Sequence, residues 1–334
     1  MRVHARLFAA TAAALLAAPA ARAATYTIDI SSGLDLQSVS TGATGDTVFR
    51  ISPATGAVAV QSGAGRRLST TSVRAQVSIS CRAAGVSDTD CATRTVAIRA
   101  GSIGTLTGRA RALTNFTVAM GTATLAAPPS GTNPLSVQLA PLGENSPNTF
   151  FIGADFPVAG DDTGLATGNG ENSFYVYMVN STGLQLAGDT DKGKVKALRA
   201  LAVAKTADLS FGRLQIPTSG TSLVTLSESS GARTITGAGF AYPTPAPTRG
   251  AFTISGEGGQ QVSLTIPATL TLARAGSGTL AVDITSTARG TPSLSGGLGG
   301  AGGYSFTLGG SFTITPATPT GAYSGVMTVS IDYN

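Results

Sequence analysis

The last eight residues, 327–334, read MTVSIDYN, and they indicate the fold class. Met327, Val329, Ile331 and Tyr333 fall on alternate positions, with polar residues between them. Successive side chains of a β-strand point to opposite faces, so this alternation predicts a half-buried strand that runs to the final residue.

The same two-residue period recurs through the chain. In the second half it appears at 262–266, 280–284, 306–308 and 312–314, and in the first half at 26–30, 73–79 and 174–179. Glycine-rich turn signals separate these runs at intervals of roughly eight to twelve residues. No 3.6-residue pattern lies between them, so the sequence predicts an all-β fold built as a sandwich or barrel.

The composition agrees with short strands. Charged residues make up only 12% of the chain, whereas amphipathic helices normally expose glutamate and lysine. Threonine and serine hydroxyls suit the outward faces of strands instead. After the N-terminal segment, no apolar run approaches the roughly 18 residues of a membrane helix, so no membrane span is expected.

The N-terminus has the pattern of a signal peptide. Arg2, His4 and Arg6 precede an apolar run at 7–18, and small residues at 21–23 suit cleavage. We therefore expect export to the periplasm, the cell surface or the medium. Three of the 22 basic residues lie in this segment, which leaves 19 against 17 acidic residues, a net charge of +2. With no basic stripe, nucleic-acid binding is not expected.

The two halves look like diverged copies. Residues 148–158 align with 304–314, and 48–56 align with 223–231 in apolar spacing. The alanine- and lysine-rich segment 194–205 also suits a helix, but its counterpart 24–30 is extended, which favours a strand. The predicted organisation is a signal peptide at 1–23, a first domain at 24–183, a polar linker at 184–193 and a second domain at 194–334.

Cys81 and Cys91 are the only cysteines. After export they meet an oxidising compartment, so a disulfide is expected, worth roughly 2–3 kcal/mol by loop-closure entropy. A metal or redox role is disfavoured because the spacing is not C-x-x-C.

Nothing in the sequence favours an enzyme. The only histidine, His4, leaves with the signal peptide, which removes Ser-His-Asp systems and histidine-ligated metals. The four lysines lie between Lys192 and Lys205 and form no S-x-x-K pattern. We expect no cofactor and no catalytic residues.

Loop carboxylates leave a metal alternative open. Asp161, Asp162, Asp189 and Asp191 lie in predicted turns, where oxygen-only calcium sites occur. Their spacing lacks the rest of an EF-hand loop, so solvated turn aspartates are the preferred interpretation and no metal site is predicted.

A proline-rich segment at 123–148 stands out. Long irregular loops on a rigid β scaffold often carry recognition. The residues proposed as a binding loop are Pro128, Pro129, Pro134, Leu135, Pro141 and Leu142. The alternative is that 135–139 forms one more core strand flanked by turns.

The second half resembles a bacterial family of secreted domains of unknown function. The resemblance rests on DLSFG at 208–212, FTISG at 252–256, FTLGG at 306–310 and GAYSG at 321–325. That family is similar to the pilins of chaperone-usher fimbriae and to the spore-coat protein U group. The first half keeps Phe151-Ile152-Gly153 but lacks the D-L-x-F-G start and the G-x-Y turn.

This resemblance implies two tandem immunoglobulin-like, pilin-like β-sandwich domains, with an open sheet edge completed by a neighbour's strand. It implies a fimbrial tip adhesin: the first domain meets a surface receptor, and the second binds fimbrial subunits or a periplasmic chaperone and usher by strand donation. The alternatives are a self-contained secreted or envelope structural protein and a carbohydrate-binding module. The absence of tryptophan weakens the latter.

Overall fold

The computed structural model describes residues 23–71, 73–86, 88–288 and 290–334. Strands dominate this part of the chain, and only a short helix, α1 (Asp90–Thr93), and a 3₁₀ turn at Asp161–Thr163 interrupt them. The prediction of an all-β fold is confirmed. The predicted signal peptide lies outside the described residues, and among those described no helix is long and apolar enough to cross a membrane.

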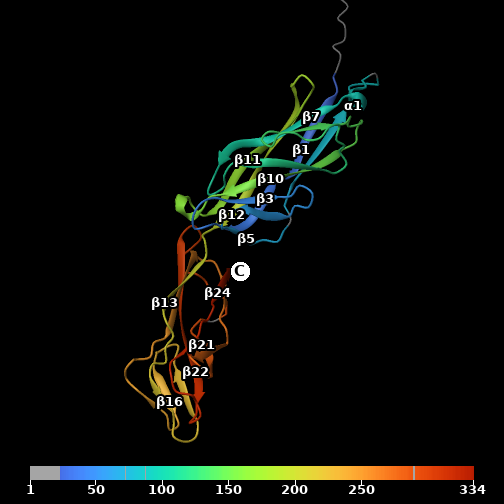
Figure 1. The fold of residues 1–334 in the computed structure, drawn as a ribbon. Helices are drawn as coiled ribbons and strands as arrows, with labels where there is room; N and C mark the ends of the chain where they lie inside the picture. The colour runs from blue at the N-terminus through green and yellow to red at the C-terminus, as the bar shows by residue number, and fades with distance from the viewer. Residues whose placement is uncertain (1–22, 72, 87, 289) are drawn as a thin grey trace, which may run out of the picture.

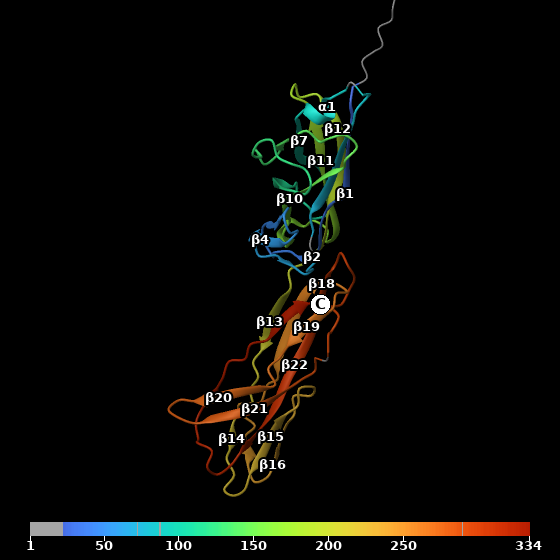
Figure 2. The ribbon, with the colours of Figure 1, turned by 90° about the vertical axis from the view of Figure 1, so that its right-hand side faces the viewer.

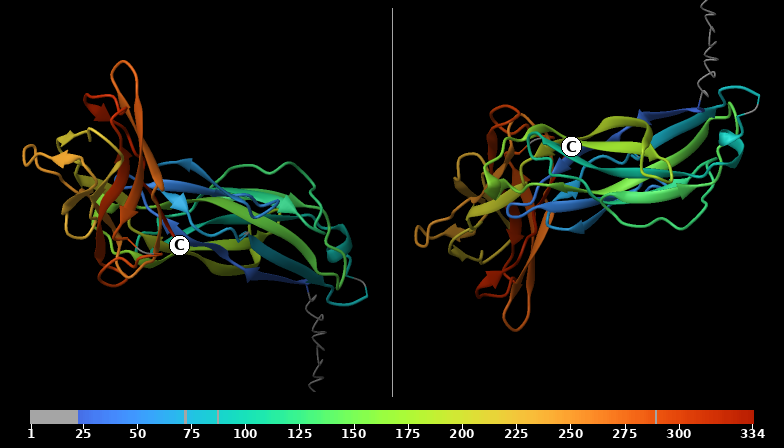
Figure 3. Two further views of the ribbon diagram at one scale, coloured as in Figure 1. Left: turned by 90° about the horizontal axis from the view of Figure 1, so that it is seen from below. Right: turned by 90° about the horizontal axis from the view of Figure 1, so that it is seen from above.

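The strands form two units arranged end to end (Figure 1). The N-terminal unit (25–198) holds β1 to β12, and the C-terminal unit (202–333) holds β13 to β24. The view turned by 90° shows the two units one after the other, and no sheet in the described part of the chain contains strands of both (Figure 2). Seen from below, the C-terminal unit lies in front of the N-terminal unit, and seen from above it lies behind (Figure 3).

The N-terminal unit is a sandwich of two sheets. One sheet has the order β1 (Thr25–Ser32), β6 (Ala75–Arg82), β10 (Asn148–Val158), β3 (Thr47–Ile51) and β4 (Val58–Ser62), and β8 (Thr114–Met120) also pairs with β10. The other has the order β5 (Arg66–Arg67), β2 (Leu34–Ser40), β12 (Gln185–Leu198), β11 (Gly168–Val179), β7 (Val96–Leu106) and β9 (Leu135–Leu139). Alternate residues of both sheets meet in one continuous buried core.

The C-terminal unit has one large sheet and two short ladders. The sheet has the order β13 (Ala202–Ala207), β18 (Gly250–Glu257), β22 (Ala301–Ile314), β21 (Thr279–Ser286), β20 (Thr269–Arg274) and β23 (Tyr323–Ser324). β15 (Ser222–Leu226) joins it by pairing with β22 and with β16 (Arg233–Thr236). The ladders join β14 (Leu214–Gln215) to β17 (Phe240–Ala241) and β19 (Val262–Thr265) to β24 (Ser330–Tyr333).

The core of the C-terminal unit is divided. One buried cluster surrounds Phe211 and Phe312, and a second surrounds Phe306. Many apolar residues around the first cluster are only partly buried, among them Leu270, Leu272 and Leu280 on β20 and β21. Part of this unit's apolar surface is therefore left without cover.

The segments aligned in the sequence hold the same position in the two units. β10 pairs with β3 and β6, and β22 pairs with β15 and β18. The cross-strand pair Thr47–Val158 corresponds to Ser222–Ile314 in the alignment. In both units the buried hydroxyl of this pair accepts a hydrogen bond from a glycine N–H, of Gly65 or of Gly239, at 2.8 Å.

The predicted linker at 184–193 is wrong. β12 runs unbroken from Gln185 to Leu198, antiparallel to β11 and parallel to β2, so it belongs to the N-terminal unit's sheet. Main-chain pairing to β11 holds this polar segment extended, and β2 pairs with β12 only from Gly193 onward. The chain crosses between the units only at 199–201, which also moves the predicted domain boundaries at 183 and 194.

The strand predicted at 327–334 is shorter than expected. β24 begins at Ser330, and residues 325–329 pair with no strand of the described chain. Their alternating sequence suits a strand, but the described residues provide no partner for it.

Candidate functional site

A groove of about 920 Å³ opens on the side of the C-terminal unit. One wall is the segment 205–216, which leads from β13 to β14, and the other is 318–327, which contains β23. β20, β21 and β22 contribute residues between them. The two walls come from opposite ends of this unit's sequence, so the groove lies between its first and last segments.

The floor of the groove is apolar. Phe211 and Phe312 pack edge to face with ring centroids 4.8 Å apart, and Leu270, Leu272 and Leu280 extend the surface. Lys205, Asp208 and Arg213 lie along one wall. An apolar floor between polar walls suits an amphipathic segment better than a small polar ligand.

The walls also carry free main-chain groups. Residues 325–329 belong to no ladder within the described part of the chain. Val326, in the middle of this stretch and on the groove, has a relative exposure of 93%. An unpaired edge beside an apolar groove is a template for another strand.

The N-terminal unit shows what closes the equivalent site. There β12 lies between β11 and β2, antiparallel to the first and parallel to the second, and buries Val195 and Ala197 in the core. β2 pairs with β5 as β14 pairs with β17, so β2 corresponds to 209–215. β11 pairs with β7 as β24 and β23 pair with β19 and β20, so β11 corresponds to the segment that contains β23 and β24. These are the segments that wall the groove, and no described strand lies between them.

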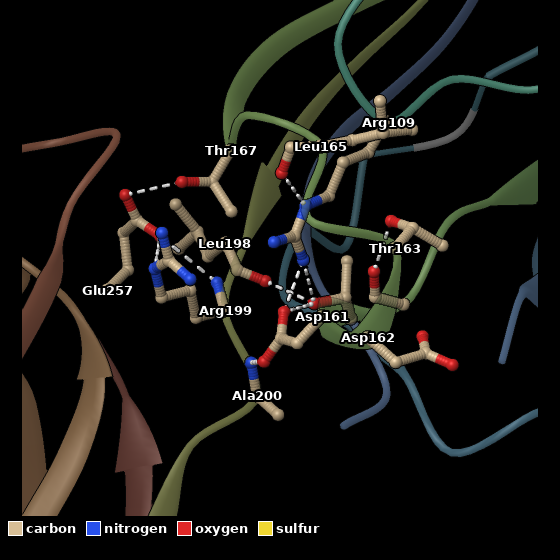
Figure 4. Close-up of polar contacts among 12 residues, drawn as sticks. Arg109, Asp161, Asp162, Thr163, Leu165, Thr167, Leu198, Arg199, Ala200 and Glu257 are labelled. Atoms are coloured by element: carbon tan, nitrogen blue, oxygen red, sulfur yellow. Dashed lines mark hydrogen bonds and ion pairs between the residues drawn. The ribbon is translucent and has the colours of Figure 1, made fainter. Parts of the chain in front are cut away.

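A polar network joins the units at the crossing segment (Figure 4). On the N-terminal side Arg109 is buried, with an exposed fraction of 1%, and it donates to Leu165 O at 3.0 Å and to the carboxylate of Asp161. The other oxygen of Asp161 accepts the N–H of Ala200 at 3.0 Å. Thr41 N–H donates to Leu198 O at 2.8 Å. The last residue of β12 and the crossing segment are thereby held to the N-terminal unit.

On the C-terminal side, the carboxylate of Glu257 is fully buried. It accepts the Thr167 hydroxyl at 2.9 Å, the Arg199 N–H at 3.2 Å and the N–H of Gly299, and the Arg199 side chain lies 3.7 Å away. Because Thr167 belongs to the N-terminal unit, one carboxylate bridges both units and the segment between them.

Tyr333, on β24, also belongs to this polar network around 199–201, which we call the joint. Its hydroxyl donates to Arg199 O at 2.9 Å and accepts the Glu257 N–H at 2.6 Å. Burial raises the pKa of Tyr333 to about 12. The neighbouring Asp332 forms an ion pair with Arg66 on β5 of the N-terminal unit. β24 therefore follows directly after the groove wall and contacts both the crossing segment and the other unit.

The proposed binding-loop residues divide into two groups. Leu135 and Leu142 are buried in the core. Leu135 belongs to β9, which pairs with β7 as the alternative interpretation expected, and Leu142 follows that strand. Pro128, Pro129, Pro134 and Pro141 are exposed. Main-chain hydrogen bonds hold 124–130 along β9, including Ser130–Ser136 in both directions, so the segment is held in place and is not a free loop.

The predicted disulfide is present. Cys81 at the end of β6 and Cys91 in α1 are bonded, with Cα atoms 5.6 Å apart. The bond closes the connection from β6 to β7, and both residues are buried.

The carboxylates of the loop aspartates accept hydrogen bonds from main-chain N–H groups. Asp161 accepts the Ala200 N–H at the joint, Asp162 accepts the Gly45 N–H at 3.1 Å, and Asp189 accepts the Ile30 N–H at 2.9 Å. In the described part of the chain, no cluster of three or more acidic, histidine or cysteine side chains is placed to hold a metal ion.

Neither the groove floor nor the joint between the units was predicted from the sequence. The floor had a signal, because Leu270 and Leu272 alternate with threonines before a glycine turn. The joint had none: Glu257 and Asp161 look like solvated turn residues until distant segments meet around them.

Residues 201–333 match the model of a family described as Domain of unknown function (DUF4402). This match spans the C-terminal unit. No curated protein matches the chain. A solved structure described as a chaperone-tip adhesin complex of CFA/I fimbriae biogenesis overlays with a TM-score of 0.23 and 10% identity, covering 91% of this chain and 96% of that chain. So low a TM-score carries no argument.

Proposed function

We propose that this chain is an exported fimbrial or cell-surface protein, with a C-terminal unit that accepts a β-strand from another molecule and an N-terminal unit that faces a surface. This is the arrangement of a two-domain pilus tip adhesin. The partners are a fibre subunit or a periplasmic chaperone and usher, and the chemistry is strand addition without catalysis.

One observation carries the proposal: the N-terminal unit contains β12 between β11 and β2, whereas in the C-terminal unit the corresponding segments wall an open apolar groove. The shared register of the two units makes them an internal comparison, with one unit complete and the other short of a strand.

The internal comparison also specifies the incoming strand. It runs parallel to 209–215 and antiparallel to 323–329, as β12 runs between β2 and β11. Every second side chain is apolar, because alternate residues face the floor at Phe211 and Phe312.

The test uses a peptide with the β12 sequence 190–198. Gly193 and Ala197 are replaced by isoleucine because the groove offers room for larger side chains. We expect the peptide to raise the midpoint of thermal unfolding of the full mature chain and to reduce its aggregation. Fluorescence anisotropy of the labelled peptide gives the affinity.

A matched control peptide carries aspartate at the same two positions and keeps the length and main chain. It should neither bind nor stabilise. A chain that is a stable, cooperatively unfolding monomer alone, and that ignores both peptides, contradicts strand acceptance and favours a self-contained structural protein.

A further inference from the structure

The N-terminal unit has a small polar pocket of about 380 Å³ beside the start of β2. Asp35 and Gln37 line one side, and Gln76 and Phe151, which are cross-strand partners on β6 and β10, line the other. Asp35 and Phe151 are half-buried, and the two glutamines are exposed.

Gln37 adopts a backbone conformation that glutamine rarely takes. Its φ is +60°, in the left-handed region, where a residue with a side chain is strained. Its N–H donates to the Asp35 carboxylate at 2.9 Å, but its side chain makes no hydrogen bond within the described part of the chain. No hydrogen bond of the Gln37 side chain within the described residues therefore explains why this position holds glutamine.

The C-terminal unit builds the same turn without strain. Gly212, the counterpart of Gln37, has φ +70°, and its N–H donates to the Ser210 hydroxyl at 3.2 Å, as Gln37 N–H does to Asp35. Glycine takes this conformation freely. Glycine therefore suits this backbone conformation, and in the N-terminal unit glutamine takes it instead, where the register of β2 against β12 shifts between Asp35 and Ser38.

The other lining residues also differ while the scaffold is retained. Gln76 and Phe151 correspond to the cross-strand pair Ala251 and Thr307. Arg74, which binds the carbonyls of the β3–β4 turn and lies 3.5 Å over the Phe151 ring, corresponds to Arg249, which binds the matching carbonyls. Only the N-terminal unit has a carboxylate, two amides and an aromatic ring around this spot.

We propose that this pocket binds a single sugar residue of a surface glycan. Asp35 has a carboxylate oxygen without a hydrogen bond within the described residues, and it can accept from sugar hydroxyls. The amides of Gln37 and Gln76 both donate and accept, and the guanidinium of Arg74, which lines the pocket and lies 3.5 Å over the Phe151 ring, can donate to sugar hydroxyls. The pocket volume suits one ring. This inference deepens the proposal that the N-terminal unit faces a surface.

The test applies the full mature chain to an array of neutral, amino and acidic oligosaccharides. Saturation-transfer NMR then uses the methyl glycoside of the terminal sugar of the strongest binder. We expect retention of at least one sugar class, with affinity at least tenfold weaker in Gln37→Gly and in Phe151→Thr. Gln37→Gly should also raise the midpoint of thermal unfolding, because it removes backbone strain and keeps the fold.

The matched control is Asn145→Gly, which relieves another positive φ, of +56°, in the same unit and should leave sugar binding unchanged. A folded chain that retains no sugar, or a Gln37→Gly variant that binds as tightly as the parent chain, overturns the proposal. The groove peptide is measured separately, so failure of strand acceptance is distinguishable from failure of sugar binding.

Discussion

Gly153 and Gly309 occupy the same place in the two units, each held against the end of a neighbouring strand. A Cβ on Gly153 would lie closer than 3.0 Å to Ile51 O of β3, and one on Gly309 would lie closer than 3.0 Å to Leu226 O of β15. The aligned sequence pairs these residues, glycine with glycine and isoleucine with leucine. The close approach of two main chains explains why glycine stands in both copies.

Gly309→Ala should therefore destabilise the chain by roughly 1–3 kcal/mol, because the main chains must separate to admit a methyl group. Denaturant unfolding measures the loss. Gly297→Ala is the control, since a Cβ there meets nothing within 4 Å. Equal stability of the two variants would contradict the close approach.

Val326→Asp should weaken binding of the β12-derived peptide at least tenfold while leaving the free chain's stability within about 0.5 kcal/mol. The side chain is almost fully exposed on the groove, so a charge there harms only the complex. Anisotropy measures the affinity. Leu184→Asp, an exposed site on the N-terminal unit, is the control, and unchanged affinity in Val326→Asp would place the peptide elsewhere.

Glu257→Ala should lower stability by roughly 2–3 kcal/mol, because the hydroxyl of Thr167 and two main-chain N–H groups lose a buried acceptor. It should also widen the range of angles between the units, which small-angle X-ray scattering detects as a larger maximum dimension or a broader distance distribution. Glu144→Ala, at an exposed position, should change neither property. If Glu257→Ala leaves both unchanged, the buried carboxylate does not hold the units together.

Stability should fall as the pH rises from about 10 to about 12, in part through Tyr333. Its folded pKa is raised to about 12 from an ordinary value of 10.0, so the unfolded chain releases the proton first. The contribution of Tyr333 to the free energy of unfolding is complete below pH 10. It is lost as the pH rises through the pKa of Tyr333 in the folded chain. Unfolding measured across this range should show a shallower decline in Tyr333→Phe. An identical decline would show that Tyr333 does not contribute.

Asp155 gives the opposite dependence on pH. Burial raises its pKa, but hydrogen bonds from Arg50 and Asn115 outweigh burial and leave the pKa below its usual value. The contribution of Asp155 to the free energy of unfolding is complete above its pKa in the unfolded chain, near 3.9. It is lost as the pH falls through its lower pKa in the folded chain. Asp155→Asn should flatten the acid limb of stability below about pH 4. Asp29→Asn, on the exposed face of β1, is the control and should leave the limb steep.

The alternating runs predicted most core strands because each has one buried and one wet face. The first part of β12, predicted as a linker, escaped detection for a physical reason. At 188–193 its side chains are glycine, threonine, aspartate and lysine, and what holds it extended is main-chain pairing to 172–177 of β11. That pairing depends on main-chain groups, and the pattern of side chains does not record it.

In the proline-rich segment the strand pattern was visible in the sequence, but a binding loop was predicted instead. Leu135, Val137 and Leu139 alternate as a strand should, yet the surrounding prolines drew attention to recognition. The prolines flank β9 and lie outside its ladder, where a missing N–H does no harm. The matching positions of 148–158 and 304–314, by contrast, were predictable, because strands that pair in the same way need the same residue spacing.

The segment 199–201 between the units is too short and too firmly bonded to act as a flexible tether. Tension applied to the distal end of the N-terminal unit would reach β24 through the Arg199 carbonyl and the Tyr333 hydroxyl, with little slack chain to straighten first. Such a load would thus be felt in the strand that follows directly after the groove wall.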